Sequence, residues 1–288
     1  MPLPMYQPSD KSPLPDKMKV IAIAAGKGGV GKSSVTVNLA LALKKLGYSV
    51  GIMDTDIYGP SIRKMLPEDS LPSQKGNVII PAMCSGIPMI SMAYFRKDHE
   101  AAVVRAPIAN GVITQFIRQV EWGNLDFLLI DFPPGTGDVQ LTLCQHANLT
   151  GAIMVTTPQE VAILDVRKAI NMFDQVKVPI LGIVENMSYY FHQKTSEKIY
   201  IFGQGGGKRL ADEAGVPLLG TIPIDPELCV CGDMGQSIFA KDPESLTPSV
   251  KAFEALALNV IDHVSLLTSE SSGNLSSFEL QWKEMPTT

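Results

Sequence analysis

Near the N-terminus, a glycine-rich loop separates a short apolar run, residues 20–24, from a segment of helical periodicity, residues 32–46. The loop reads Gly26, Lys27, Gly28, Gly29, Val30, Gly31, Lys32, Ser33, Ser34. Its pattern, G-x-x-x-x-G-K-[ST], is that of a phosphate-binding loop, in which backbone N–H groups surround the phosphates, the lysine reaches the β and γ oxygens and the hydroxyl binds Mg²⁺. A bound anion would also lie at the positive end of the following helix. We therefore expect residues 26–34 to hold a nucleoside triphosphate.

The same loop contains a second pattern, G-x-G-x-x-G, which is typical of dinucleotide-binding folds. It is formed by Gly26, Gly28 and Gly31, and Asp54 follows at about the distance of 20 residues that such a fold requires. A dinucleotide site has no use for a lysine and a hydroxyl directly after its last glycine, whereas a triphosphate site with Mg²⁺ uses both. Lys32 and Ser33 therefore favour the triphosphate interpretation.

Short apolar runs alternate with helical segments between residues 18 and 266, which we expect to form one domain. The expected strands are 20–24, 50–53, 125–130, 152–155 and 180–184, and the expected helices are 32–46, 110–120, 161–173, 208–214 and 249–266. Strands that are apolar throughout are typical of a parallel sheet covered on both faces. We predict an α/β fold: a doubly wound, mostly parallel sheet with helices on both faces and its ligand site at the carboxyl ends of the strands.

Three segments depart from this alternation. Residues 57–102 contain five prolines and are expected to form loops and short strands at one edge of the sheet. Residues 1–17, also with five prolines, and residues 267–288, which are polar at their start, are predicted to be flexible extensions.

Composition bounds the class of protein. The chain has 288 residues, 45% of them hydrophobic, which is enough for a sizeable core. Its net charge of −5 argues against nucleic acid or an anionic membrane as a partner. No apolar run approaches about 18 residues, and the N-terminus lacks the features of a signal peptide. A cytoplasmic location without nucleic-acid or membrane partners is the resulting prediction.

Acidic residues follow two of the expected strands. Asp54 and Asp56 end one strand, and Asp131 ends another in the manner of a Walker B aspartate, which orients Mg²⁺ or its water ligands. Asp131 leads into a diproline and two glycines, in which the backbone N–H of Gly135 is placed to sense a γ-phosphate. These acids and the loop predict one Mg²⁺-nucleotide site.

With its early lysine, Lys27, the loop resembles the deviant Walker A of the MinD/ParA/nitrogenase-iron-protein class of dimeric ATPases. Further blocks resemble the Mrp/ApbC family of iron–sulfur cluster carriers: DTDIYGPS at 54–61, DFPPGTGD at 131–138, TPQE at 157–160, ENMSY at 185–189 and IFGQGG at 201–206. The resemblance extends from about Lys19 to Ala240. It implies a homodimer that hydrolyses ATP slowly and carries iron–sulfur clusters to apoproteins or assembly factors.

The resemblance also implies a role for each matching residue. Lys27 would reach across the dimer to the ATP of the other subunit, Lys32 would bind the phosphates of its own ATP, and Asp56 would position the attacking water. Ser33, Asp54 and Asp131 would lie at Mg²⁺, and Asn186 would hydrogen-bond the adenine. This chemistry is phosphoryl transfer to water by positioning and charge neutralisation.

The sequence departs from this family at one place. Where the family has a C-x-x-C that holds a bridging cluster, this chain has His192 and Thr195. Two alternatives remain for Cys229 and Cys231: the C-x-C of two subunits holds a cluster, or both are ordinary, partly buried thiols. Cys144, in an apolar helical run, is expected to be buried.

Two rival functions stay open. One is a MinD- or ParA-like positioning ATPase, although residues 271–288 have one lysine and no basic amphipathic pattern. The other is an ATP-dependent scaffold that carries no cluster itself. The segment 203–209 also looks like a second phosphate loop, but no hydroxyl follows its lysine, so a tight turn and helix start is expected there.

Overall fold

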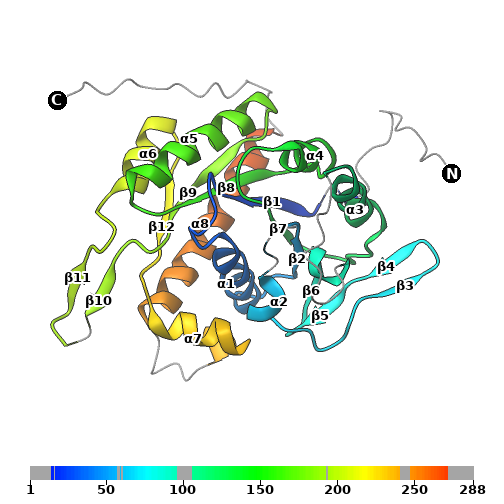
Figure 1. The fold of residues 1–288 in the computed structure, drawn as a ribbon, viewed down its shortest axis with the longest axis horizontal. Coiled ribbons are helices and arrows are strands. Elements are labelled where there is room, and N and C mark those ends of the chain that lie inside the picture. The colour runs from blue at the N-terminus through cyan, green and yellow to red at the C-terminus, as the bar shows by residue number, and fades with distance from the viewer. Residues whose placement is uncertain are drawn as a thin grey trace.

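Parallel strands form the centre of the molecule in the computed structural model, which describes residues 14–15, 17–56, 59, 61–95, 106–192, 194–240 and 247–271. The main sheet has the order β12-β9-β8-β1-β7-β2-β6-β5 (Figure 1). Its strands are β1 (Lys19–Ala24), β2 (Val50–Asp54), β5 (Ala82–Cys84), β6 (Ile87–Ser91), β7 (Phe127–Asp131), β8 (Gly151–Thr156), β9 (Ile180–Glu185) and β12 (Leu218–Thr221). Only β5, at the edge, pairs antiparallel within the described part of this sheet.

Helices cover both faces of the sheet, because alternate side chains of each central strand point to opposite sides. Val20 and Ala22 of β1 belong to one core cluster, and Ile21 and Ile23 to the other. The first cluster is covered by α3 (Ala106–Gln119), α4 (Asp138–His146), α5 (Glu160–Gln175) and α6 (Gly206–Ala214); the second by α1 (Lys32–Lys45), α2 (Ile62–Met65), α7 (Pro226–Met234) and α8 (Pro248–Ser271). The predicted doubly wound fold is confirmed.

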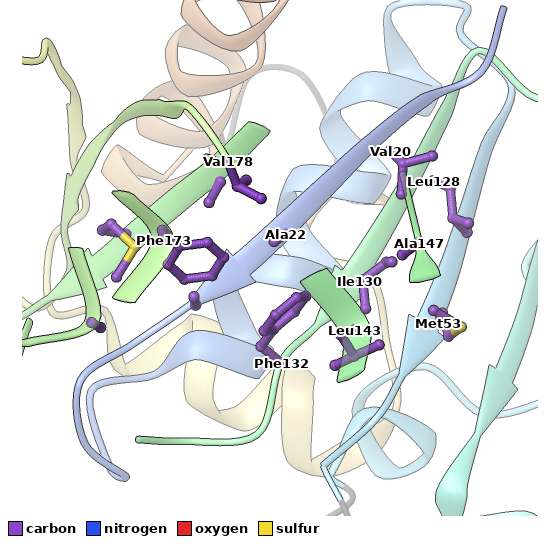
Figure 2. Close-up of a cluster of buried hydrophobic side chains, with 14 of the residues drawn as sticks. Val20, Ala22, Met53, Leu128, Ile130, Phe132, Leu143, Ala147, Phe173 and Val178 are labelled. Atoms are coloured by element: carbon purple, nitrogen blue, oxygen red, sulfur yellow. The ribbon is translucent and has the colours of Figure 1, made fainter. Parts of the chain in front are cut away.

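The first core cluster is drawn in Figure 2, where Phe132 and Phe173 lie beside Ala22 of β1. Their ring centroids are 5.7 Å apart at an interplanar angle of 45°. Phe132 follows β7 directly and is fully buried, so it packs the end of this strand firmly against the core. The diproline segment that begins at Pro133 therefore starts from a fixed point.

Some elements were not predicted. The chain adds β12 to the sheet, a helix α7, and a small hairpin of β10 (Tyr190–His192) with β11 (Glu197–Ile199). A second hairpin, β3 (Ser73–Lys75) with β4 (Val78–Ile80), lies within residues 57–102, where short strands were expected. Short 3-10 turns, η1 (Met92–Phe95) and η2 (Ile238–Ala240), complete the described elements. The edge position of β5 and β6 agrees with the expectation for residues 57–102.

Both chain ends are described in part. The predicted extensions, residues 1–17 and 267–288, lie largely outside the described residues, but Leu14 is buried in the first core cluster and α8 continues to Ser271. Among the helices that the structure describes, none is long and apolar enough to span a membrane.

Candidate nucleotide site

The predicted acids lie together at the carboxyl edge of the sheet. Strands β2 and β7 are parallel neighbours, and their register places Asp54 directly beside Asp131. Asp56 follows two residues after the end of β2, and its carboxylate lies 3.7 Å from the ammonium of Lys32. The parallel pairing therefore brings carboxylates from two separate segments against the start of α1.

Asp131 is the centre of this cluster and is fully buried. It accepts hydrogen bonds from the hydroxyls of Ser33 at 2.7 Å and Thr36 at 2.9 Å, and its carboxylate lies 2.9 Å from the Lys32 ammonium. The backbone N–H of Thr55 donates to the carbonyl of Asp131, which ties the end of β2 to the same residue. Asp131 thus holds the first turn of α1 and the two strand ends in one arrangement.

Lys32 is buried, with only 7% of its surface exposed, between Asp56 and Asp131. Its ammonium forms an ion pair with Asp131 but no hydrogen bond of standard geometry among the described residues. The ammonium has three donors, and the ion pair with Asp131 leaves some of them available to a further acceptor. The position, next to the N-terminus of α1, suits a phosphate.

Asp54 forms the floor of the site. It is fully buried, and its carboxylate accepts hydrogen bonds from the Ser91 hydroxyl at 2.7 Å and the backbone N–H of Asp56 at 3.1 Å. Burial, followed by the repulsion of Asp131, raises the pKa of Asp54 to about 7. Mg²⁺ is usually held by one or two carboxylates together with waters and substrate phosphates, so Asp131, with Asp54 beside it, suits such an ion.

The phosphate loop is packed tightly on one side and open on the other. A Cβ atom at Gly26 would lie 2.1 Å from the backbone of Asp165 in α5, whereas one at Gly28 would meet nothing within 4 Å. Gly31 precedes α1 with φ of 83°, a left-handed conformation that favours glycine. Glycine at 26 and 31 is therefore required by the packing and the turn.

The open side of the loop carries Lys27, which is half-buried and forms no hydrogen bond or ion pair within the described part of the chain. Gly29 beside it is exposed. Ser34 points elsewhere, and its hydroxyl contacts the sulfur of Met65 at 3.6 Å. The backbone N–H of Gly135 donates to Ala25 at 3.3 Å, so the segment after Asp131 contacts the strand that leads into the loop.

Asn186 joins the phosphate loop to the far end of the sheet. Its side-chain amide donates to the carbonyl of Val30 at 2.9 Å, and its backbone N–H donates to Thr156 at 2.7 Å. Two residues later, the backbone N–H of Ser188 donates to Ile222, beyond β12. A continuous set of contacts therefore runs from the loop to the segment that follows β12.

A pocket of about 220 Å³ lies at the end of this path. Its lining consists of Tyr190, Phe191, Pro223, Ile224, Asp225, Pro226, Glu227, Thr247 and Pro248. The Asp225 Oδ2 atom and the Thr247 hydroxyl are buried without a hydrogen-bond partner among the residues that the structure describes. Aromatic and proline walls with unpaired polar atoms suit a ligand that has a flat apolar part and hydroxyl groups. None of these lining residues was singled out from the sequence.

The arrangement of Cys229 and Cys231 differs from the one that the cluster hypothesis requires, in which both thiols of each subunit bind one cluster. Cys229 and Cys231 lie on a helix, α7. Residues two apart on a helix point to different sides, and here Cys229 is exposed while Cys231 is 4% exposed. The two thiols of one chain therefore do not face one ligand together.

The two other uncertain segments have structural explanations. His192 Nδ1 lies 3.0 Å from the hydroxyl of Thr195, so these side chains contact each other at the end of the β10–β11 hairpin. The segment 203–209 forms a turn and the start of α6, as expected, and the backbone N–H of Gly207 donates to the buried carboxylate of Glu185 at 2.6 Å. A backbone N–H at the start of α6 therefore already has a hydrogen-bond acceptor within the chain.

Fold and site together define a nucleotide-binding P-loop protein of α/β class. A solved structure of a nucleotide-binding protein in complex with ADP from Archaeoglobus fulgidus is 38% identical, with a TM-score of 0.69, and covers 82% of this chain and 92% of that chain. The septum site-determining protein MinD with Mg-ADP from Pyrococcus horikoshii shares the fold, with a TM-score of 0.61 at 24% identity over 87% of this chain and 98% of its own.

Sequence comparison defines the family more closely. The family model described as the NUBPL iron-transfer P-loop NTPase, of the ParA group, matches residues 17–261, and the chain belongs to this family. A protein named iron-sulfur cluster carrier protein, from Synechocystis, is 45% identical over 271 residues, which cover 90% of this chain and 76% of the relative. The resemblance found in the sequence motifs is confirmed.

Proposed function

We propose that this chain binds Mg-ATP at the Lys32–Asp131 site, hydrolyses it slowly, and uses this cycle to deliver iron–sulfur clusters to apoproteins. The observation that carries the nucleotide half is the buried Lys32 ammonium, which lies at the start of α1 between Asp131, at 2.9 Å, and Asp56, at 3.7 Å. The delivery half rests on membership of the iron-transfer family and on the names of its relatives.

The residues divide the chemistry of ATP hydrolysis among them. Lys32 binds the β and γ phosphates, and Ser33 and Asp131 hold Mg²⁺ directly or through water, with Asp54 behind them. Mg²⁺ supplies neutralisation of the charge that develops on the phosphates. Asp56, which is 9% exposed and accepts a hydrogen bond from the backbone N–H of Gly59, orients the attacking water. Positioning and electrostatic stabilisation account for most of such a reaction.

We assign the nucleoside to the pocket beyond Asn186. The purine would lie against Tyr190 and Pro223, with Asn186 at its edge. The unpaired Asp225 Oδ2 and the Thr247 hydroxyl would pair with the ribose hydroxyl groups. The contacts from Val30 through Asn186 to the segment after β12 support one elongated site for phosphates and nucleoside.

Two subunits are proposed to act together. Lys27 forms no hydrogen bond or ion pair within the described part of its own chain, and Lys32 is placed to bind the phosphates of its own subunit's nucleotide. The exposed apolar residues Val161 and Leu164 of α5 are neighbours of Asp165, which packs against Gly26. An apolar patch beside the loop suits a two-fold interface in which Lys27 enters the partner's site. Cytoplasmic localisation stays a prediction.

The proposed function is tested in two measurements on the full chain. Calorimetry should give Mg-dependent ATP binding, and a coupled assay should give slow phosphate release. Anaerobic transfer from the cluster-loaded protein to an apo-ferredoxin should depend on a functional nucleotide site. ATP binding without any transfer would instead favour the scaffold hypothesis, and ATP-dependent co-sedimentation with DNA or liposomes would favour the positioning ATPase.

A further inference from the structure

Iron–sulfur clusters are held by thiolates, usually four for each cluster. The chain contains four cysteines, and the structure describes all of them as free. They lie on three elements: Cys84 on β5, Cys144 on α4, and Cys229 with Cys231 on α7. Figure 1 shows α4 and α7 on opposite sides of the sheet, and β5 at its edge. Within the described part of one chain, the thiols of these three elements do not gather into a group of three or more metal ligands.

Three of the four thiols are also shielded. Cys84 is fully buried, and burial raises its pKa to about 12. Cys144 packs against the first core cluster, and burial raises its pKa to about 12 as well. Cys231 is 4% exposed, and its pKa is also raised, chiefly by burial. A thiol must lose its proton to bind iron, so these three are poor ligands.

The remaining thiol, Cys229, is exposed on the outer side of α7. One accessible thiol per chain gives two in a two-fold dimer, which is half of the usual ligand set. Nitrogen and oxygen ligands do not fill the gap, because the described residues contain no group of three or more His, Cys, Asp or Glu side chains placed to hold a metal ion. The chain's own residues do not fit a complete cluster site.

We propose that a cluster handled by this chain is held jointly with a second molecule that supplies thiolates, so that the carrier state is a mixed complex. This inference rests on the proposed function, because it concerns how the cargo is held. The thiolates have two possible sources with the same chemistry, a small thiol such as glutathione or paired cysteines of a partner protein. In either case the fold contributes the nucleotide site and at most the Cys229 thiolate of each subunit, and the second molecule contributes most of the ligands.

The experiment is anaerobic reconstitution of the full chain with iron and sulfide, followed by desalting under three conditions. The first buffer contains no thiol, the second contains glutathione, and the third contains a synthetic Cys-x-x-Cys peptide with a Ser-x-x-Ser peptide as its matched control. Iron and sulfide per dimer are then measured. ATP binding by calorimetry on the same preparations tests the nucleotide half of the proposed function independently.

We expect about tenfold more retained iron and sulfide in at least one thiol-containing buffer than in thiol-free buffer. Glutathione or the Cys-x-x-Cys peptide, whichever retains the cluster, identifies the kind of source. A stoichiometric cluster that wild type retains without added thiol would overturn the proposal, and so would equal, near-zero iron in all three buffers. Cys229→Ser tests the chain's own share: it should bind ATP as wild type does, and undiminished cluster retention would assign all ligands to the second molecule.

Discussion

Lys32 is buried between two carboxylates, and its substitution should affect nucleotide binding before anything else. Removing its charge-assisted bonds to phosphate should weaken Mg-ATP binding by about 10- to 100-fold. We therefore predict for Lys32→Ala a large loss of affinity in calorimetry. Lys45→Ala is the matched control, because Lys45 is a partly exposed lysine of the same helix that pairs with Glu254 at 2.7 Å. Equal ATP affinity in Lys32→Ala and wild type would contradict the assignment.

Thiol reactivity offers a second prediction at this scale. The pKa of Cys84 and Cys144 is raised to about 12. At pH 8 such a thiol contains about a thousandfold less thiolate than a thiol whose pKa is about 9. Raising the pH toward 12 would ionise these thiols, so their reaction should accelerate with pH. In native protein at pH 8, titration with Ellman's reagent should detect one fast thiol.

The control for this titration is Cys229→Ser, which should remove the fast phase, while denaturant should expose all four thiols of wild type. Fast reaction of two or more thiols in the native state would show that the helix or the core opens readily. It would also contradict the count of one accessible thiol per chain, on which the mixed-complex proposal depends.

Individual site residues were predictable where a motif prescribes their chemistry. Lys32, Ser33 and Asp131 are prescribed by the phosphate loop and the strand that ends in aspartate, and Asp131 contacts Ser33 at 2.7 Å and Lys32 at 2.9 Å. Thr36 was missed, although it follows Lys32 by one helical turn and so lies on the same side of α1. Ser91 was missed because it depends on which strand pairs with β2, and the sequence does not specify that neighbour.

At the scale of elements, two separate alanine substitutions, at Gly26 and at Gly28, test the contact between the phosphate loop and α5. At Gly26 a Cβ atom would overlap the backbone of Asp165 at 2.1 Å, and the backbone cannot move aside cheaply. Gly26→Ala should therefore lower the free energy of unfolding by about 1–3 kcal/mol in urea titrations. Gly28→Ala, with nothing within 4 Å, should change it by about 0.5 kcal/mol or less. Equal effects would contradict this packing.

The start of α7 couples a helix cap to the proposed nucleoside pocket. The Asp225 side chain accepts from the backbone N–H of Glu227 at 2.9 Å, and its second oxygen has no described partner. Asp225→Ala should cost about 1 kcal/mol of stability through the lost cap, whereas Asp225→Asn keeps a good cap.

Calorimetry then separates the two roles of Asp225. Both variants should bind ATP more weakly if the carboxylate faces the ribose, since the amide replaces one acceptor oxygen with a donor. Unchanged affinity in Asp225→Asn would place the nucleoside elsewhere, whatever the result of Asp225→Ala in unfolding experiments.

Long, strongly patterned elements were predictable, and short ones were not. The five expected strands occur in the sheet because continuous apolar runs need cover on both faces. Strand β12 has four residues and the β10 and β11 strands three each, too few for a period to appear. Helix α7 was not predicted because its sequence contains proline, glycine and cysteine, although Asp225 before Pro226 is a recognisable helix start.

At the scale of the whole molecule, two copies of the chain are predicted to work as a dimer. The phosphate loop has a packed side against α5 and an exposed side that carries Lys27, and the apolar Val161 and Leu164 lie nearby on α5. A single chain leaves these groups in solvent, whereas a two-fold dimer would cover the apolar residues and give Lys27 a phosphate to bind. ATP should therefore promote association.

Lys27→Ala provides the decisive variant for this association. In the proposed arrangement Lys32, not Lys27, binds the phosphates of the same subunit, so the variant should keep ATP affinity within about threefold of wild type and lose most hydrolysis, as when an arginine finger is removed. Asp56→Ala should bind ATP without hydrolysing it and so accumulate the dimer in sedimentation velocity, and Lys45→Ala should behave as wild type in every assay. A chain that stays monomeric with ATP in the Asp56→Ala background, or a Lys27→Ala variant that hydrolyses ATP at the wild-type rate, would exclude action of Lys27 across a dimer.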